Sequence, residues 1–164
     1  MQTLIRENDM KVQCITASDY CSEERKNATL IEEQITKFAK DNQLDIPNYR
    51  EGQIIFCKNE DEIIGFLQFY QYSKTKEFYI SWVFVKDTFR GHGLFNKMFK
   101  YLKSLAILYD IYIITSHVLQ DNHISNLVHK KLGFIQVNSK TVVLPYKDAN
   151  RFNGYTYVLK ESDK

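Results

Sequence analysis

The chain has 164 residues, of which 44% are hydrophobic and 26% are charged, and its formal net charge is +2. These values are typical of a globular domain, since about 100–200 residues is the usual domain length, and they exclude a disordered chain. The weak net charge argues against nucleic-acid binding, which requires a clustered basic surface. We therefore expect one domain spanning residues 1–164.

The sequence also indicates the compartment of the protein. No apolar run reaches the ~18 residues of a transmembrane helix, and the charged start of the chain does not fit a signal peptide. The three cysteines, Cys14, Cys21 and Cys57, form no CxxC pair, so we expect neither a disulfide framework nor a metal site. We expect a cytoplasmic protein with reduced thiols and no membrane contact.

The first part of the sequence predicts a strand, a helical region and three further strands. Residues Lys11–Ala17 alternate apolar and polar side chains, which indicates a strand. From Ser22 to Asp41 apolar residues recur at helical spacing, as one helix or two short ones. Three strand-like runs joined by short polar turns then predict an antiparallel meander: Gln53–Cys57, Ile63–Tyr72 and Glu77–Val85.

The second part of the sequence predicts two helices and three strands. From Leu94 to Ala106 the apolar residues form one stripe, the clearest amphipathic pattern in the chain. A second helix begins at Asp121 or Asn122 and ends at Gly133, a natural left-handed cap. We expect its apolar side chains to face inward: Ile124, Leu127, Val128 and Leu132. The predicted strands are Ile111–Val118, Phe134–Val137 and Tyr155–Leu159, which completes a mixed, layered α/β domain.

A glycine-containing loop precedes the first of these helices. In the run Arg90-Gly91-His92-Gly93, the glycines leave backbone N–H groups uncovered at the first turn of the helix. Such groups bind phosphate readily, and Arg90 adds a cation that can pair with phosphate. The loop fits neither the nucleoside-triphosphate nor the dinucleotide fingerprint. Taken alone, it is either a phosphate site or an ordinary helix start.

The second helix carries an uncharged polar face. Asn122, Ser125, Asn126 and His129 share that face by helical spacing. The face is either solvent-exposed surface or a ligand-contacting surface. The absence of charged residues from it favours the second interpretation in a chain this rich in lysine.

Both features resemble those of a known family. The run Arg90-Gly91-His92-Gly93-Leu94-Phe95 resembles the R/Q-x-x-G-x-G/A loop of the GNAT superfamily of acyl-CoA-dependent N-acyltransferases. Asn122-x-x-Ser125, followed by His129-Lys130-Lys131-Leu132-Gly133-Phe134, is similar to its signature N-x-x-A-x-x-x-Y-x-K-x-G-F. The resemblance implies a mostly antiparallel, twisted sheet of six to seven strands flanked by helices. Its central strands, Glu77–Val85 and Ile111–Val118, would splay apart.

The resemblance further implies an N-acetyltransferase that moves an acetyl group from acetyl-CoA to a primary amine by direct transfer in a ternary complex. A backbone N–H near Val85 would polarise the thioester carbonyl, as in an oxyanion hole. The diphosphate would bind the amides of Gly91 to Phe95, and the pantetheine arm would lie near Phe84. The cofactor-binding residues expected on this basis are Phe84, Val85, Arg90, Gly91, His92, Gly93, Leu94, Phe95, Asn122, Ser125 and Asn126.

Five residues are candidates for proton transfer. His129 stands where the family usually places a tyrosine, and as an imidazolium it could protonate the departing thiolate. Tyr155 or Tyr157 could supply the proton instead. The candidate bases for the ammonium are Glu77, at the start of a central strand, and His117, acting through a water molecule. For each of these residues the alternative is an ordinary surface or strand position.

The sequence leaves the acceptor open between a small-molecule amine and a peptide amine. A non-catalytic acyl-CoA-binding or regulatory module of the same fold is the main alternative, because the tyrosine has become His129. The third hypothesis is an unrelated α/β interaction domain, in which the glycine loop is coincidental. Aromatic side chains on two adjacent strands could line an acceptor pocket or a homodimer contact.

Overall fold

The computed structural model describes residues 11–15, 33, 36–37, 40, 53–60, 62–142 and 149–164. The helical region predicted from Ser22 to Asp41 therefore lies almost entirely outside the described residues. The chain divides into two compact units: Met1–Gln68 with Trp82–Leu102, and Phe69–Ser81 with Lys103–Lys164. In the parts of the chain that are described, no helix has the length and apolar character needed to cross a membrane.

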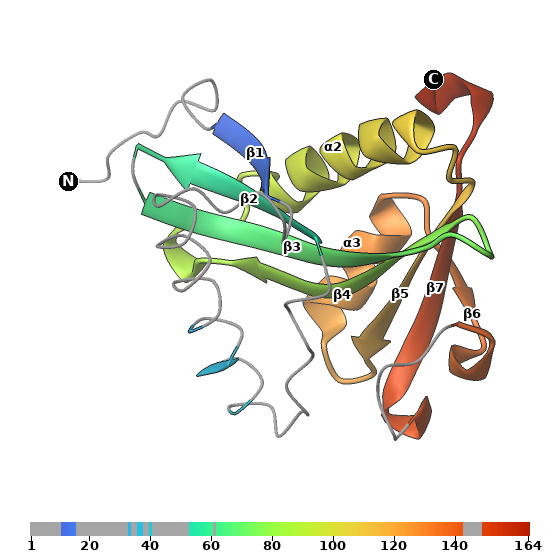
Figure 1. The fold of residues 1–164 in the computed structure, drawn as a ribbon. Coiled ribbons are helices and arrows are strands. Elements are labelled where there is room, and N and C mark those ends of the chain that lie inside the picture. The colour runs from blue at the N-terminus through green and yellow to red at the C-terminus, as the bar shows by residue number, and fades with distance from the viewer. Residues whose placement is uncertain are drawn as a thin grey trace. The chain divides into compact units, whose positions relative to one another are not determined.

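Seven strands form one mostly antiparallel sheet in the order β1-β2-β3-β4-β5-β7-β6 (Figure 1). Strands β3 and β4 contribute residues to both units. The seven strands are β1 (Lys11–Ile15), β2 (Gln53–Asn59), β3 (Glu62–Tyr72), β4 (Glu77–Val85), β5 (Ile113–Leu119), β6 (Ile135–Val137) and β7 (Phe152–Val158). The mixed α/β class and all seven strands are as the sequence predicts, although β7 begins earlier than expected.

Among the described residues, two longer helices and four short 3-10 helices have defined bounds. Helix α2 spans Leu94–Leu108 and α3 spans His123–Lys131. The short helices are η2 (Asp87–Phe89), η3 (Ser139–Thr141), η4 (Ala149–Arg151) and η5 (Glu161–Asp163). Helix α2 begins at the residue that the apolar stripe predicts.

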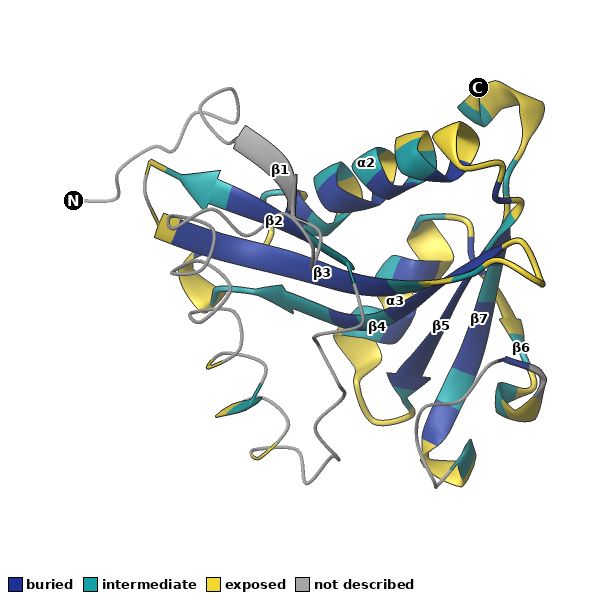
Figure 2. Ribbon diagram, viewed as in Figure 1, coloured by how far each residue is buried: buried dark blue, intermediate teal, exposed yellow. Residues whose placement is uncertain are grey.

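The first unit has an apolar core built from β2, β3 and the start of α2. Met98, Phe99 and Leu102 are almost fully buried, and Figure 2 shows α2 with one buried and one exposed side. A Cβ atom added at Gly65 would lie 3.1 Å from the carbonyl oxygen of Phe84, so glycine allows β3 and β4 to approach closely here. Cys57 is also buried, and burial raises the pKa of its thiol to about 11, although the charge of Lys97 opposes this shift.

The second unit is organised around β5. Residues Ile113–Ser116 of β5 pair in parallel with Glu77–Ile80 of β4, and β5 pairs with β7 in antiparallel fashion along its whole length. A parallel neighbour requires a crossover connection, which α2 supplies in the chain order. This register decides which polar side chains of β4, β5 and β7 meet within the second unit.

Candidate active site

The loop before α2 presents backbone N–H groups. Arg90 N donates to Asp87 O at 3.2 Å, and Lys97 N donates to Gly93 O at 3.0 Å. Between these bonds, the amides of residues 91–94 donate to no acceptor in the described part of the chain. Amides at a helix start carry partial positive charge, so this loop can bind an anion such as a phosphate.

Two glycines give the loop its backbone path. Gly91 has φ 82° and Gly93 has φ 71°, in the left-handed region that side-chain-bearing residues rarely adopt. A Cβ atom at either position would meet no heavy atom within 4 Å, so conformation and not space requires glycine. The neighbouring Phe95 ring contacts Phe99 edge to face, with centroids 6.5 Å apart, as its place on the apolar stripe predicts.

Arg90 lies beside the loop in a defined position. Its Nε donates to the carbonyl oxygen of Val85 at 3.2 Å, and its Nη2 lies 2.8 Å from Asp87 Oδ1. Both charged side chains are more than half exposed. A bound phosphate would therefore compete with Asp87 for the guanidinium, at little cost because exposed ion pairs contribute little stability.

Helix α3 is turned the opposite way from the prediction. Its buried residues are Asn126 and His129, whereas Ile124 and Leu127 are 73% and 53% exposed. The apolar side chains of this helix therefore do not all face inward as expected. The physical reason is that polar side chains of β5 and β7 provide hydrogen-bond partners for the polar face.

His129 is held as a neutral imidazole in that buried face. Its Nδ1 donates to the carbonyl oxygen of Ser125 at 2.8 Å, so its Nε2 is an acceptor and lies 3.2 Å from the hydroxyl oxygen of Ser116. Burial lowers the pKa of His129 to about 4, although the bond to Ser125 opposes this shift. At pH 7 the imidazolium that the acid role requires is about one part in a thousand.

Asn126 is the centre of a hydrogen-bonded cluster. Its Nδ2 donates to the carbonyl oxygens of Leu119 and Asn122 at 2.9 and 2.8 Å. Its Oδ1 accepts from the Tyr155 hydroxyl at 2.7 Å and from Asn153 Nδ2 at 2.9 Å. Both amide hydrogens and the oxygen of Asn126 are therefore already used within the protein.

The other two polar residues predicted on α3 form its N-terminal cap. Asn122 Oδ1 accepts from Ser125 N at 3.1 Å, a standard capping bond. The Tyr157 hydroxyl, one alternative proton donor, bonds the carboxylate of Asp163 at 2.8 Å. Tyr155, the other, bonds Asn126. Both alternative proton donors, Tyr155 and Tyr157, are thus engaged in hydrogen bonds inside the second unit.

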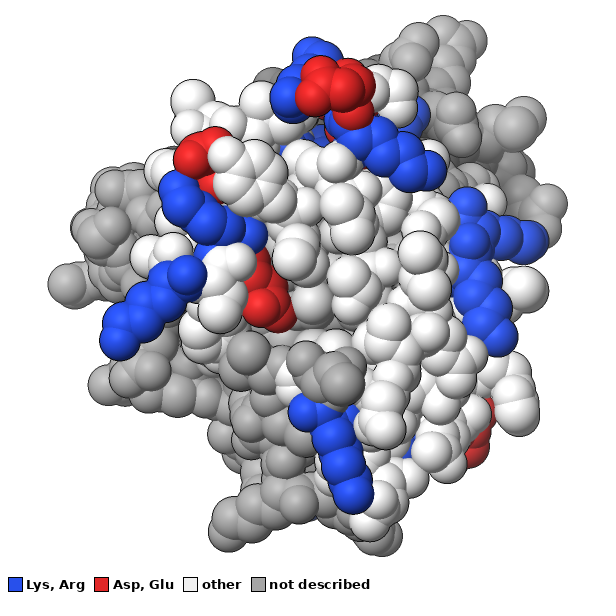
Figure 3. All heavy atoms as spheres, turned by 90° about the vertical axis from the view of Figure 1, so that its right-hand side faces the viewer, with Lys and Arg blue, Asp and Glu red and all other residues white. Residues whose placement is uncertain are grey.

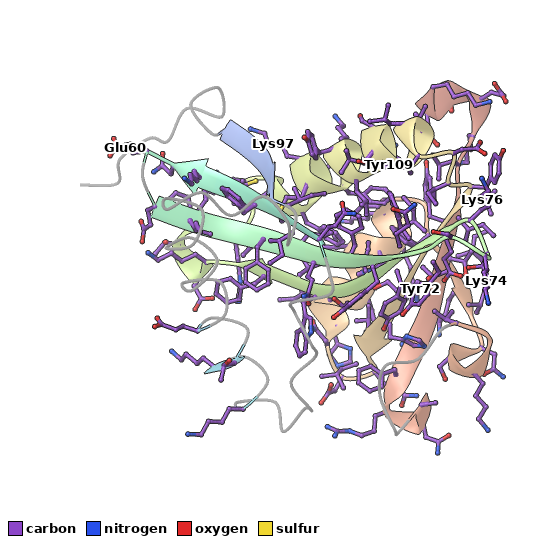
Figure 4. The ribbon with its side chains drawn as sticks, in the orientation of Figure 1. Glu60, Tyr72, Lys74, Lys76, Lys97 and Tyr109 are labelled. Atoms are coloured by element: carbon purple, nitrogen blue, oxygen red, sulfur yellow. The ribbon has the colours of Figure 1, made fainter. Side chains whose placement is uncertain are left out.

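Glu77 is buried, with 8% of its surface exposed. The Thr115 hydroxyl donates to Glu77 Oε1, and the Thr75 hydroxyl lies 3.3 Å from Oε2. Tyr72 ends β3, directly before the turn that leads to Glu77 at the start of β4 (Figure 4). Burial raises the pKa of Tyr72, and the negative charge of Glu77 raises it further. The carboxylate is therefore fixed by hydroxyl donors and acts electrostatically on its surroundings.

His117 is the second polar centre on this side of β5. Its Nε2 donates to the carbonyl oxygen of Ser139 at 2.8 Å, so Nδ1 accepts the Tyr79 hydroxyl hydrogen at 3.0 Å. Burial lowers the pKa of His117, while the Ser139 bond and the charge of Glu77 raise it. The net decrease keeps the imidazole neutral and able to accept a proton near pH 7.

The predicted proton-transfer residues do not form one cluster. Side chains alternate along a strand, so Thr115 and His117 point to one face of β5 and Ser116 points to the other. Glu77 bonds Thr115, and His129 bonds Ser116. The structure brings the two candidate bases to one face of β5 and places His129 on the opposite face.

Sequence reasoning missed several polar residues in these clusters: Tyr79, Thr115, Ser116 and Asn153. Strand alternation alone places Tyr79 on the face of Glu77, and that signal could have identified it. The other three depend on the register between strands distant in the chain.

The neutral state of His129 has a measurable consequence for stability. Its pKa is about 4 in the folded protein and about 6.5 when unfolded, so the unfolded chain binds the proton more readily between these values. We expect the stabilisation present above pH 6.5 to be lost as the pH falls towards 4, by about 3 kcal/mol. His129→Gln should flatten this part of the pH dependence. Urea unfolding at several pH values tests this, and equal slopes for both proteins would contradict it.

Comparisons with known proteins agree with this architecture. Residues 19–134 match the acetyltransferase (GNAT) family model. The fold is similar to an acetyltransferase from Streptococcus agalactiae (TM-score 0.70, 17% identity, 92% of this chain and 99% of that chain). It is also similar to a GNAT acetyltransferase from Elizabethkingia anophelis solved with acetyl-CoA bound (TM-score 0.60, 15% identity, 93% and 99%).

A third structural match is shorter. Nourseothricin acetyltransferase matches with a TM-score of 0.57 and 11% identity over 66% of this chain, which spans only 65% of that protein. No match was found among curated protein sequences. Because the family match covers more than half of the chain and the fold agrees with it, the chain belongs to the GNAT family of acetyltransferases.

Proposed function

We propose that this protein transfers an acetyl group from acetyl-CoA to a primary amine, by direct attack of the amine on the thioester within one domain spanning residues 1–164. Family membership supports an acyl-CoA donor. The observation that carries the proposal is the set of amides at residues 91–94, which have no acceptor among the described residues, on a loop whose backbone path requires Gly91 and Gly93. These amides would hold the diphosphate of the donor.

The remaining donor contacts follow from the neighbouring main chain and side chains. Arg90 would pair with the diphosphate in exchange for Asp87. Backbone groups of Phe84 and Val85 would bond the pantetheine arm, and an N–H near Val85 would stabilise the oxyanion. That Asn122 and Ser125 contact the donor stays a prediction. Asn126 would contribute by holding the start of α3 in place, since its own amide is fully bonded.

His117 is our proposed base for the acceptor ammonium. Nδ1 already accepts the Tyr79 hydroxyl hydrogen, so a proton arrives through that hydroxyl. The Tyr79 oxygen takes the ammonium proton while its own proton passes to Nδ1, and the free amine then attacks the thioester. The C–N bond forms, the second proton of the nitrogen passes to solvent, the C–S bond breaks, and the thiolate leaves. Glu77 is the other candidate for proton acceptance.

The leaving thiolate requires little help at neutral pH. A thiol of pKa about 8.5 is largely protonated by solvent near pH 7. We therefore assign no catalytic step to protonated His129 at this pH. That His129 acts as the acid stays a prediction from the sequence. If the leaving thiolate did require an acid, the neutral state of His129 would favour the second candidate function, an acyl-CoA-binding module without turnover.

A thermal-shift assay with acetyl-CoA, followed by release of free thiol with a panel of primary amines, tests the proposal. Stabilisation with turnover is expected; stabilisation without turnover would favour the binding module. Gly93→Val should raise the Kd for acetyl-CoA about tenfold or more, because a β-branched residue resists φ near 71°.

A matched variant separates loop strain from general instability. Gly133 also has positive φ, 93°, but lies at the end of α3. Gly133→Ala should lower the melting temperature and leave the Kd for acetyl-CoA unaltered. An unchanged Kd in Gly93→Val would contradict the assignment of the loop.

A further inference from the structure

Glu77 is a buried carboxylate that forms no ion pair with any residue in the described part of the chain. Of its surface 8% is exposed, and its described bonds are to the hydroxyl groups of Thr115 and Thr75. The ion pairs within the described part of the second unit are Lys76–Asp110, Lys103–Asp163 and Lys164–Glu161, and none includes Glu77. A buried carboxylate is stable only when paired or well hydrogen-bonded, so a cationic ligand would complete this site.

The surroundings of Glu77 are suited to an aliphatic cation. Ile113 is its direct neighbour in the sheet register. The charge of Glu77 also helps to raise the pKa of the half-buried Tyr72, so the two side chains interact electrostatically. Lys76, at the same turn, already pairs with Asp110 at 2.8 Å (Figure 4). On the face drawn in Figure 3, cationic side chains lie mainly around the edge and the central area is largely uncharged. Ile113 and Tyr72 could therefore contact the methylene groups of a ligand while its ammonium contacts the carboxylate.

The Glu77 carboxylate lies on the same face of the sheet as His117, the proposed base. Oε1 is bonded to Thr115, and His117 is two residues further along the same face of β5. Two residues of a strand span about 6–7 Å. A short aliphatic diamine could therefore place one nitrogen at Glu77 while the other is deprotonated by way of Tyr79 and His117.

We propose that Glu77 recognises a second positive charge on the acceptor, so that the acceptor is an aliphatic amine with two ammonium groups. This inference rests on the proposed acetyltransferase function. Glu77 then acts in binding, and its charge raises the affinity for the distal ammonium through a charge-assisted hydrogen bond.

The wild-type protein provides the first test. Thiol release at saturating acetyl-CoA is compared for 1,4-diaminobutane, 1-aminobutane and 4-amino-1-butanol. The distal ammonium of the diamine is absent from 1-aminobutane and is replaced by a hydroxyl in 4-amino-1-butanol. We expect kcat/KM for the diamine to exceed both others about tenfold or more, mainly through KM. Equal values would overturn the inference and leave the proposed function intact. Stabilisation by acetyl-CoA without turnover of the diamine would also overturn it, and no stabilisation would remove the proposed function itself.

Variants of Glu77 then test its role. Glu77→Gln should reduce the ratio of diamine to monoamine kcat/KM towards one, and Glu77→Asp should retain part of the preference. Glu62→Gln is the matched control, because Glu62 is an exposed carboxylate paired with Lys86 in the first unit. A fall in kcat for all three amines with the ratio preserved would make Glu77 a base and overturn the inference. If Glu77→Gln fails to fold, the wild-type ratio alone decides.

Discussion

Replacing His117 with glutamine should lower kcat about a hundredfold at saturating acetyl-CoA and amine, which is the lower range for loss of a general base. Glutamine can still accept from Tyr79 and donate to Ser139, so the local structure should survive. In the wild-type protein, kcat/KM should fall as the pH decreases through the lowered pKa of His117, because a protonated imidazole cannot accept the ammonium proton. Initial rates between about pH 5 and 8 measure both effects.

Two further variants make this result specific. Tyr79→Phe should also reduce kcat, because it removes the hydroxyl through which the proton reaches Nδ1. His123→Gln removes an exposed histidine at the start of α3 and should leave the rates unaltered. If His117→Gln retained wild-type turnover, His117 would not be the base. Glu77 would then be the first alternative to test.

Asn126→Leu should lower the free energy of unfolding by about 3 kcal/mol, because it removes four hydrogen bonds in a buried cluster. Leucine has nearly the same size, so the loss would come mainly from polar groups left without partners. Those groups are the Tyr155 hydroxyl and the Asn153 amide, because the carbonyl oxygens of Leu119 and Asn122 also accept from the backbone N–H groups of Asn122 and Asn126. Urea denaturation of both proteins at neutral pH measures the difference.

The same substitution at an exposed asparagine provides the comparison. Asn96 lies on the exposed side of α2, and Asn96→Leu should change stability by less than about 0.5 kcal/mol. Tyr155→Phe should cost about 1 kcal/mol, since only one donor is lost. A change below about 1 kcal/mol in Asn126→Leu would show that water replaces the lost bonds, and Asn126 would then be available for a ligand.

The sequence predicts best where the signal is local. The strand Glu77–Val85, the start of α2 at Leu94 and the loop with Gly91 and Gly93 follow from alternation, periodicity and residue type within a few positions. Within the described part of the chain, the amides of residues 91–94 have no acceptor because glycines and a helix start adjoin in the sequence, so this candidate phosphate site can be proposed without any long-range information.

The α3 face and the His117 cluster could not be predicted in this way. In α3 the apolar pair Ile124 and Leu127 suggests the wrong buried side. The partners that make the other side favourable, among them Asn153 and Tyr155, come from β7 and depend on its register with β5. Likewise, Tyr79 and His117 are 38 residues apart and meet through the pairing of β4 with β5. Periodicity within one element carries no information about such cross-strand partners.

The burial of Cys57 has a practical consequence for any colorimetric assay of coenzyme release. Disulfide reagents react with thiolates, and a thiol with pKa about 11 is ionised to about one part in a thousand at pH 8. Cys57 should therefore add no background signal on the timescale of turnover. Slow colour development from this position in the absence of amine would instead report transient opening of the first unit's core, which turns the side chain into a built-in probe of local unfolding.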